Sequence, residues 1–184
     1  MNRKTFAAKT GAALLTASLL ATSIPLGATA ASVQRVTALL RPETSIVVDG
    51  SARTFYNVSG QEVHPILYNG TTYLPVRAIG ELMDKNVDWN QSTLTVTIGG
   101  ARTTADVTGT PDATAKESNV TAELRPDFTI VVDGTVRTFQ DVNGNTVYPM
   151  LYNGSTYLPV RAVGELMGKT VSWNGSTQTV TLSN

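Results

Sequence analysis

The chain contains the same sequence unit twice. Residues 68–83, YNGTTYLPVRAIGELM, return as residues 152–167, YNGSTYLPVRAVGELM, 84 positions later. The same offset aligns residues 36–98 with residues 120–182 without a gap, and about two-thirds of the aligned positions are identical. Such self-similarity is the mark of a repeated structural unit, so we expect two copies of one small fold and not one large fold.

Each copy of this stretch predicts a hairpin that leads into a helix. Asn69-Gly70 lies between strand-forming residues. Asn-Gly is the strongest short-range signal for a two-residue turn, because both central residues need positive φ. Pro75 then suits the first position of a helix, where its missing N–H is not needed and its fixed φ is already helical.

The apolar face of this predicted helix includes a glycine. The face consists of Val76, Ile79, Gly80 and Met83, at i, i+3, i+4 and i+7. A helix of about nine residues is not stable alone in water, so this face must lie on a sheet. Gly80 costs about 1 kcal/mol relative to alanine in a helix, yet it recurs as Gly164. Its recurrence predicts that the helix backbone comes close to the sheet there.

The rest of each copy is typical of short β-strands. Apolar and polar residues alternate between turn signals such as Asp49-Gly50, most clearly over residues 94–98. Most of these strands are joined by hairpins and should therefore be antiparallel. We predict an α+β fold of two tandem small domains, each an antiparallel β-sheet of about five or six strands wrapped on one short helix.

Residues 1–30 have the pattern of a secretory signal peptide. Its parts are a basic start, an apolar run and a small-residue cleavage site: Arg3, Lys4 and Lys9, then residues 11–24, then residues 28–30. The alternative is a membrane anchor, but polar residues interrupt the run, which falls short of about 20 solidly apolar residues. We expect cleavage after Ala30, a secreted or cell-surface protein, and no membrane span in the mature chain.

The repeat also sets the predicted domain boundaries. We assign residues 33–98 to the first domain and residues 120–184 to the second. Residues 99–119 lack periodicity and are rich in Gly, Thr, Ala and Asp. They contain a single proline, so we predict a flexible linker between the domains.

Charge and cysteine content exclude several classes of function. The chain has 14 basic and 14 acidic residues, but three of the basic residues belong to the predicted signal peptide, which leaves 11 against 14, or about −3. An acidic surface without basic clusters argues against nucleic-acid binding. The absence of cysteine excludes disulfides, thiolate metal sites and a cysteine nucleophile. A small exported domain without disulfides points to a bacterial envelope protein.

The motifs IVVDG, YLPVRAIGELM, VDWN and TLTVTI resemble the N-terminal stalk domain of copper amine oxidases. The resemblance covers residues 46–98 and 130–182, which gives two tandem copies. It implies an antiparallel sheet around a helix and a non-catalytic appendage, which also occurs without the enzyme in exported proteins of Gram-positive bacteria. The enzyme's chemistry does not carry over. It needs three histidine ligands for copper and a tyrosine in an Asn-Tyr-Asp/Glu context, whereas this chain has one histidine and neither tripeptide.

The residues shared by both copies form a predicted structural signature, in which we expect no catalytic, cofactor-binding or metal-binding group. The signature is Asn69, Gly70, Pro75, Arg77, Gly80, Glu81 and Trp89 in the first copy, and Asn153, Gly154, Pro159, Arg161, Gly164, Glu165 and Trp173 in the second.

Two candidate metal sites have simpler explanations. His64 is the only histidine, and one imidazole without other strong ligands does not make a copper or zinc site. Asp141 begins a segment, DVNGN, that is similar to the start of a calcium loop. However, the sixth position is Thr146 and not glycine, and the twelfth is Tyr152 and not glutamate. We therefore interpret the segment as a turn.

An arginine and a glutamate four residues apart recur in the predicted helices. Arg77 precedes Glu81, and Arg161 precedes Glu165. An arginine early in a helix opposes the helix dipole, so we expect it to make a tertiary contact with a carboxylate or a backbone carbonyl of the sheet. Ligand binding by the guanidinium is the alternative.

The aromatic residues leave two interpretations open. They could form a sugar-binding face in each domain, or they could belong to the core, which strands beside a helix suit equally well. The residues in question are Tyr68, Tyr73, Trp89, Tyr152, Tyr157 and Trp173.

Three functional hypotheses follow. The first is an exported, non-catalytic tandem stalk-domain protein, without cofactor, that acts as a spacer or interaction module at the bacterial cell envelope. Its partner would be cell-wall polysaccharide or another envelope protein. The second is a carbohydrate-binding module that uses the Tyr/Trp face. The third, which the missing catalytic groups disfavour, is an enzyme related to amine oxidases.

Overall fold

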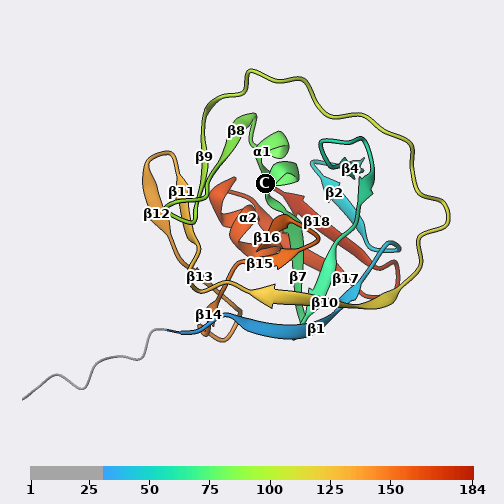
Figure 1. Cartoon of the computed structure of the whole chain (residues 1–184). Coiled ribbons are helices and arrows are strands. Elements are labelled where there is room, and N and C mark those ends of the chain that lie inside the picture. The colour runs from blue at the N-terminus through green and yellow to red at the C-terminus, as the bar shows by residue number, and fades with distance from the viewer. Residues whose placement is uncertain (1–30) are drawn as a thin grey trace, which may run out of the picture. The chain divides into compact units, whose positions relative to one another are not determined.

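The centre of the fold is a closed barrel of six antiparallel strands, three from each repeat (Figure 1). The computed structural model describes residues 31–184, so the predicted signal peptide lies outside the described residues. The first repeat contributes β1 (Gln34–Leu40), β6 (Ile66–Tyr68) and β7 (Thr71–Pro75). The second contributes β10 (Ser118–Leu124), β15 (Met150–Tyr152) and β16 (Ser155–Pro159). The order around the barrel is β1-β10-β15-β16-β7-β6.

Two seams between the repeats close this barrel, and both are centred on equivalent residues. In the pairing of β1 with β10, Thr37 lies opposite Thr121. In the pairing of β7 with β16, Leu74 lies opposite Leu158. The members of each pair are 84 positions apart in the sequence. A pseudo-twofold axis therefore relates the repeats, as a true twofold axis relates the subunits of a symmetric dimer.

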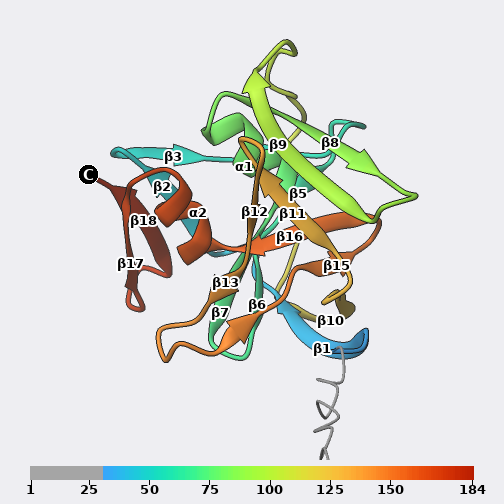
Figure 2. The ribbon, with the colours of Figure 1, turned by 90° about the vertical axis from the view of Figure 1, so that its left-hand side faces the viewer.

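The last strand of each repeat pairs with the other repeat. β9 (Thr95–Ala101) runs parallel to β11 (Thr129–Val132), and β18 (Thr179–Ser183) runs parallel to β2 (Ser45–Val48) (Figure 2). Four more strands complete the two outer sheets by hairpin pairing: β3 (Ser51–Arg53), β8 (Lys85–Asn90), β12 (Thr135–Arg137) and β17 (Thr170–Asn174). The orders are β12-β11-β9-β8 and β17-β18-β2-β3, so each outer sheet contains two strands from each repeat.

In each outer sheet, one ion pair links the two repeats. Lys85 Nζ lies 2.8 Å from Asp133 Oδ1, and Lys169 Nζ lies 2.7 Å from Asp49 Oδ1. The two pairs are equivalent under the pseudo-twofold axis and each joins one repeat to the other. Ion pairs with one exposed partner contribute about 0.2–1 kcal/mol, so most of the stability of the exchange must come from the core.

The hydrophobic core runs through both repeats without a break. Its larger cluster joins the outer sheets, both helices and the seam between Leu74 and Leu158. A smaller cluster in the barrel also draws equally on both repeats: Ala38, Ile66, Tyr73, Ala122, Met150 and Tyr157. Residues 31–184 form a single compact unit. We expected each repeat to enclose its own core, and the structure differs because neither the barrel nor either outer sheet is complete without strands of both repeats.

The two helices begin where the sequence places them, within one residue. α1 spans Val76–Leu82 and α2 spans Val160–Leu166, seven residues each, and Pro75 and Pro159 are their N-caps and not their first residues. Such a difference of one residue is within the uncertainty of any helix boundary.

The predicted close approach of the helix to the sheet is confirmed. A Cβ on Gly80 would lie 2.3 Å from Val87 Cγ2 and 2.9 Å from the Lys85 carbonyl oxygen. A Cβ on Gly164 would lie 2.2 Å from Val171 Cγ2. Each helix therefore packs on the strand that follows it, β8 or β17, at a distance that only glycine allows.

The predicted two-residue turns are also confirmed. Asn69 and Gly70 have φ values of 47° and 74°, and Asn153 and Gly154 have values of 46° and 74°. Positive φ at both central residues is what a tight hairpin turn with the right twist requires.

The strand count exceeds the prediction. Each repeat has nine strands where we expected five or six, partly because two short hairpins contribute strands of two residues: β4 (Phe55–Tyr56), β5 (Glu62–Val63), β13 (Phe139–Gln140) and β14 (Thr146–Val147). A strand-rich chain with two short helices is compatible with the α+β class. The closed barrel and the two parallel pairings differ from the simple antiparallel sheets that we expected.

The segment between the repeats runs over the outside of the molecule (Figure 1). It contacts the first repeat at several points, among them the following three. Arg102 Nη2 lies 3.4 Å from Glu81 Oε1, Thr110 forms an isolated bridge with Gln61, and the backbone N–H of Asp112 donates to Glu62 Oε2 at 2.6 Å. These contacts hold residues 102–112 against the first repeat.

Candidate functional site

Each repeat places one tryptophan at the surface, on the strand that follows its helix. The Trp89 side chain on β8 is 43 % exposed, and the Trp173 side chain on β17 is 53 % exposed. Neither indole belongs to the core, so the interpretation of the aromatic residues as core residues is wrong for these two. A large exposed aromatic side chain is a candidate for ligand binding, because its apolar face is available for stacking.

A pocket lies beside each tryptophan, and the two pockets are equivalent under the pseudo-twofold axis. The Trp173 pocket has a volume of about 540 Å³ and the Trp89 pocket about 300 Å³. Each is lined by the start of a helix, Val160 and Arg161 or Val76 and Arg77. Each also includes residues of the β-hairpin of the other repeat, 69–72 or 154–156. Because of the strand exchange, both pockets are built from both repeats.

One pair of equivalent residues makes the pockets different. Phe128, just before β11, packs on Trp89 with 4.8 Å between ring centroids, and the guanidinium of Arg125 lies 3.9 Å from the centroid of the Phe128 ring. The equivalent of Phe128 is Thr44, which lines the Trp173 pocket. A threonine is much smaller than a phenyl ring, and the Trp173 side chain is 53 % exposed where Trp89 is 43 % exposed.

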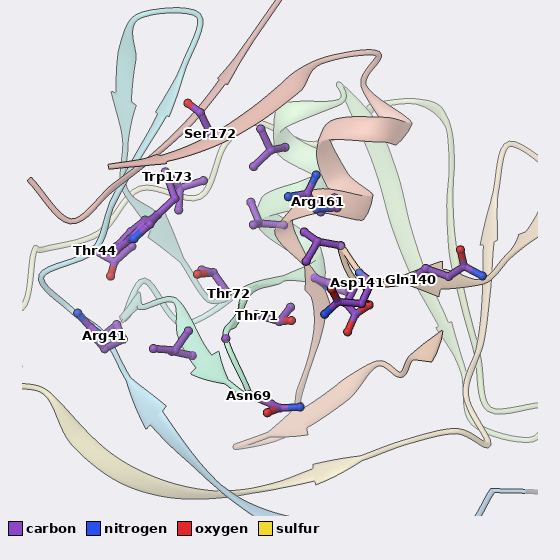
Figure 3. A pocket seen from close by; sticks show the side chains of 18 residues that line it. Arg41, Thr44, Asn69, Thr71, Thr72, Gln140, Asp141, Arg161, Ser172 and Trp173 are labelled. Carbon is purple, nitrogen blue, oxygen red and sulfur yellow. Dashed lines mark hydrogen bonds between the residues drawn. The ribbon is translucent and has the colours of Figure 1, made fainter. Parts of the chain in front are cut away.

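The lining of the Trp173 pocket combines apolar and polar side chains. Figure 3 shows Arg161 on α2, Gln140 and Asp141 at the end of β13, and the hairpin between β6 and β7 across the pocket from the helix. The polar side chains that line it are Arg41, Thr44, Asn69, Thr71, Thr72, Gln140, Asp141, Asn143, Arg161 and Ser172. The pocket thus combines one aromatic surface with hydrogen-bonding groups of both kinds.

The Asp141 carboxylate is held in place and ionised. The side-chain amide of Asn145 donates to Oδ2 at 2.9 Å, and the backbone N–H groups of Asn143 and Asn145 donate to Oδ1 at 2.8 and 2.9 Å. These hydrogen bonds hold the pKa of Asp141 below its usual range. The segment is a turn closed by its own aspartate, as we predicted, and its carboxylate is negative at neutral pH.

Arg161 has no hydrogen bond or ion pair with any residue of the range 31–184. The contact that we expected for this arginine, with a carboxylate or a backbone carbonyl, is thus not seen within that range, and Arg77 acts on the Glu81 carboxylate only through its charge. Glu165 is exposed and unpaired with Arg161 among the described residues. Glu81 instead faces Arg102, and burial raises the pKa of Glu81.

The six aromatic residues do not form one ligand face. Tyr73 and Tyr157 are 2 % exposed and lie in the smaller core cluster, with Tyr68 and Tyr152 packed against it half-buried. The tyrosines lie on barrel strands, whereas the tryptophans lie on the outer sheets, so the two sets are kept apart by the architecture. The interpretation as core is correct for the tyrosines, and only the tryptophans remain candidates for binding.

The buried tyrosines predict a loss of stability at alkaline pH. Burial raises the pKa of Tyr73 and Tyr157 above the ordinary tyrosine value of about 10. The unfolded chain therefore releases these protons at lower pH than the folded protein does. The stabilisation is fully present below about pH 10 and is lost as the pH rises beyond it. Urea midpoints measured at about pH 9 and about pH 11 should differ less in a Tyr73→Phe/Tyr157→Phe variant than in the unaltered protein. Equal differences would contradict the assignment.

Comparison with protein families gives one match. The model of the copper amine oxidase N-terminal domain matches residues 48–136 and 139–184, which is most of the chain. The chain belongs to this family. The two adjacent segments are consistent with tandem copies, and the match is to the N-terminal domain and not to the catalytic domain of the oxidases. Comparisons with curated proteins and with solved structures give no match.

The copper of the family name does not fit this chain. The only histidine is His64, which is almost fully buried, with Nδ1 3.7 Å from Glu62 Oε1. Residues 31–184 contain no group of three or more His, Cys, Asp or Glu side chains that could hold a metal ion. Copper prefers several nitrogen or sulfur donors, and one imidazole cannot supply them. Within the same range, no helix is long and apolar enough to cross a membrane.

The sequence pointed to some residues of the Trp173 pocket but not to the one that distinguishes it. Trp173 and Arg161 belong to the predicted signature. Thr44 does not belong to it. A comparison of the two copies could have pointed to this residue, because they differ at about one position in three and the change from Thr44 to Phe128 is among the largest in side-chain size. Gln140 and Thr72 were not predicted either, since nothing local indicates that they meet across the interface between the repeats.

Proposed function

We propose that this protein is exported and acts as a non-catalytic spacer or interaction module at the bacterial cell envelope, where cell-wall polysaccharide or another envelope protein is its partner. The observation that carries the proposal is the continuous core of residues 31–184. A spacer must keep its two ends at a fixed separation, and an intertwined pair of repeats resists the hinge motion that separate domains show by default.

The structural roles of the signature residues, which both copies share, support the absence of catalysis. Most of the signature serves the fold: the Asn-Gly pairs make tight turns, the prolines cap the helices and the glycines allow close helix packing. The family match is to the N-terminal domain of the oxidases and not to their catalytic domain, which is consistent with this. Export is supported by the pattern of residues 1–30.

A fractionation experiment tests the proposal. The full chain, expressed in a Gram-positive host, should appear in the envelope and medium fractions as a product that begins at Ala31. Purified protein of residues 31–184 should sediment with purified cell walls more than an unrelated acidic protein of the same size. Retention of the uncleaved chain in the cytoplasm would disprove export, and recovery no better than that of the control would disprove binding to the envelope.

Carbohydrate binding is a second candidate function. The observation that favours it is the exposed indole of Trp173 in a pocket that also has polar side chains. The site differs from the Tyr/Trp face that the sequence suggested, since no tyrosine takes part.

A further inference from the structure

We propose that the Trp173 pocket binds a carboxylate-bearing sugar of an acidic polysaccharide, and that in the equivalent Trp89 pocket the ring of Phe128 takes the place of the sugar on the indole. This inference deepens the carbohydrate-binding candidate and rests on it. It assigns the ligand to one pocket of the pair and names the group that recognises its charge.

The shape of the pocket suits a sugar ring. Its volume of about 540 Å³ is within the usual range of roughly 300–1,000 Å³ for small-molecule sites. Trp173 presents a flat apolar face, 53 % exposed, on which the apolar face of a pyranose ring can stack. In the Trp89 pocket the ring of Phe128 packs on the indole, with 4.8 Å between the ring centroids.

The polar groups suit a ligand with many hydroxyl groups. Asn69, Gln140 and Thr71 can donate and accept hydrogen bonds, and Asp141 accepts only. These groups lie on two sides of the pocket, on the hairpin of the first repeat and on the segment after β12 of the second. A polyhydroxylated ligand satisfies such a mixed lining better than an apolar ligand would.

The basis for a negatively charged ligand is Arg161, which shares the lining with the negative Asp141. Two arginines line the pocket, but Arg41 already contacts Glu43 and lies 3.0 Å from Glu117. Arg161 has no such partner among residues 31–184. A guanidinium binds a carboxylate through two parallel hydrogen bonds, which is the strongest polar contact that this lining can offer. The same arginine favours an acidic sugar over its neutral counterpart.

The two repeats provide matched variants for a test. Thr44→Phe gives the Trp173 pocket the ring that packs on the indole of its twin, and Phe128→Thr removes that ring from Trp89. Arg161→Gln removes the guanidinium of the Trp173 pocket, and Arg77→Gln is the same change in the Trp89 pocket. Circular dichroism and thermal midpoints of all four variants, in residues 31–184, establish that each is folded.

Calorimetric titration with an oligogalacturonate of about four sugars, and with the same oligosaccharide after reduction of its carboxyl groups, measures binding. We expect one site per chain for the acidic form. Thr44→Phe should abolish binding, Arg161→Gln should weaken it by roughly 10–100-fold, as loss of a charged hydrogen bond does, and Arg77→Gln should leave it unchanged. Phe128→Thr should raise the stoichiometry to two sites.

Unchanged binding by folded Thr44→Phe, or equal binding of the reduced oligosaccharide, would overturn the proposal, as would the absence of binding by the unaltered protein. The outcome is separable from that of the cell-wall experiment. If the protein sediments with cell walls but does not bind the oligogalacturonate, the envelope function stands and this inference fails. If it binds the oligogalacturonate but does not sediment with cell walls, this inference stands and binding to the envelope fails.

Discussion

Replacement of Leu74 by alanine is expected to destabilise both repeats together, by about 2–5 kcal/mol. Leu74 is fully buried and lies opposite Leu158 on the seam between β7 and β16, inside the larger core cluster. The side chain therefore packs against residues of both repeats. Its loss leaves a cavity at their shared interface, and the rest of the core can close that cavity only in part.

Urea denaturation of residues 31–184 checks this prediction. The unfolding is followed by Trp89 alone and by Trp173 alone, in variants that carry phenylalanine in place of the other tryptophan. Both signals should shift to lower urea by the same amount, because the protein unfolds as one cooperative unit. Val58→Ala, at a position that is 72 % exposed, is the control and should change the stability by less than about 0.5 kcal/mol. A shift of the Trp89 transition alone would contradict a shared core.

The first repeat expressed alone, residues 31–101, is expected not to fold as a monomer. It would lack three of the six barrel strands, and β2 would lose its neighbour β18. A two-stranded hairpin is at best marginally stable by itself. Since the seams join equivalent residues, two copies of one repeat can in principle make the same contacts with each other, as in a symmetric dimer.

Sedimentation velocity and circular dichroism over a range of concentrations test this second prediction. The single repeat should be unfolded when dilute and should gain β-structure only as it dimerises. Addition of the second repeat, residues 118–184, should produce a folded one-to-one complex. A folded monomer of residues 31–101 at all concentrations would show that the repeat is an independent domain, contrary to the structure.

The local features of the fold could be predicted because their causes are local. The Asn69-Gly70 turn depends on two residues that accept positive φ, and the start of α1 depends on Pro75. Gly80 indicated close packing because a glycine is costly in a helix unless space requires it. Each of these signals is contained in a few consecutive residues.

The strand exchange could not be predicted because the two possible pairings look alike in the sequence. β2 and β11 both contain Ile-Val-Val, and β9 and β18 both contain Thr-Val-Thr. β2 of the same repeat and β11 of the other repeat therefore offer β9 nearly the same side chains as a pairing partner. Hydrophobic patterns describe which face of a strand is buried, but they do not distinguish between two identical partners.

The site was predictable only in part for the same reason. The alternation of Val87, Asp88 and Trp89 indicated a half-buried strand, and Val87 does pack beneath Gly80. Trp89 lies further along the strand, beyond the cover of the helix, where Phe128 of the other repeat reaches it. Whether a tryptophan is covered thus depends on a residue of the other repeat, 39 positions from Trp89 in the sequence.

Cysteine cross-linking tests the exchange of strands most directly, because the natural chain contains no cysteine. In the structure Thr97 of β9 is the partner of Val131 in the other repeat. If β9 paired within its own repeat, its partner would be Val47, as the pairing of Thr181 with Val47 shows by equivalence. Under mild oxidation we predict an internal disulfide in the variant Thr97→Cys/Val131→Cys and none in Thr97→Cys/Val47→Cys. The opposite result would show that the repeats fold separately and would contradict the intertwined architecture.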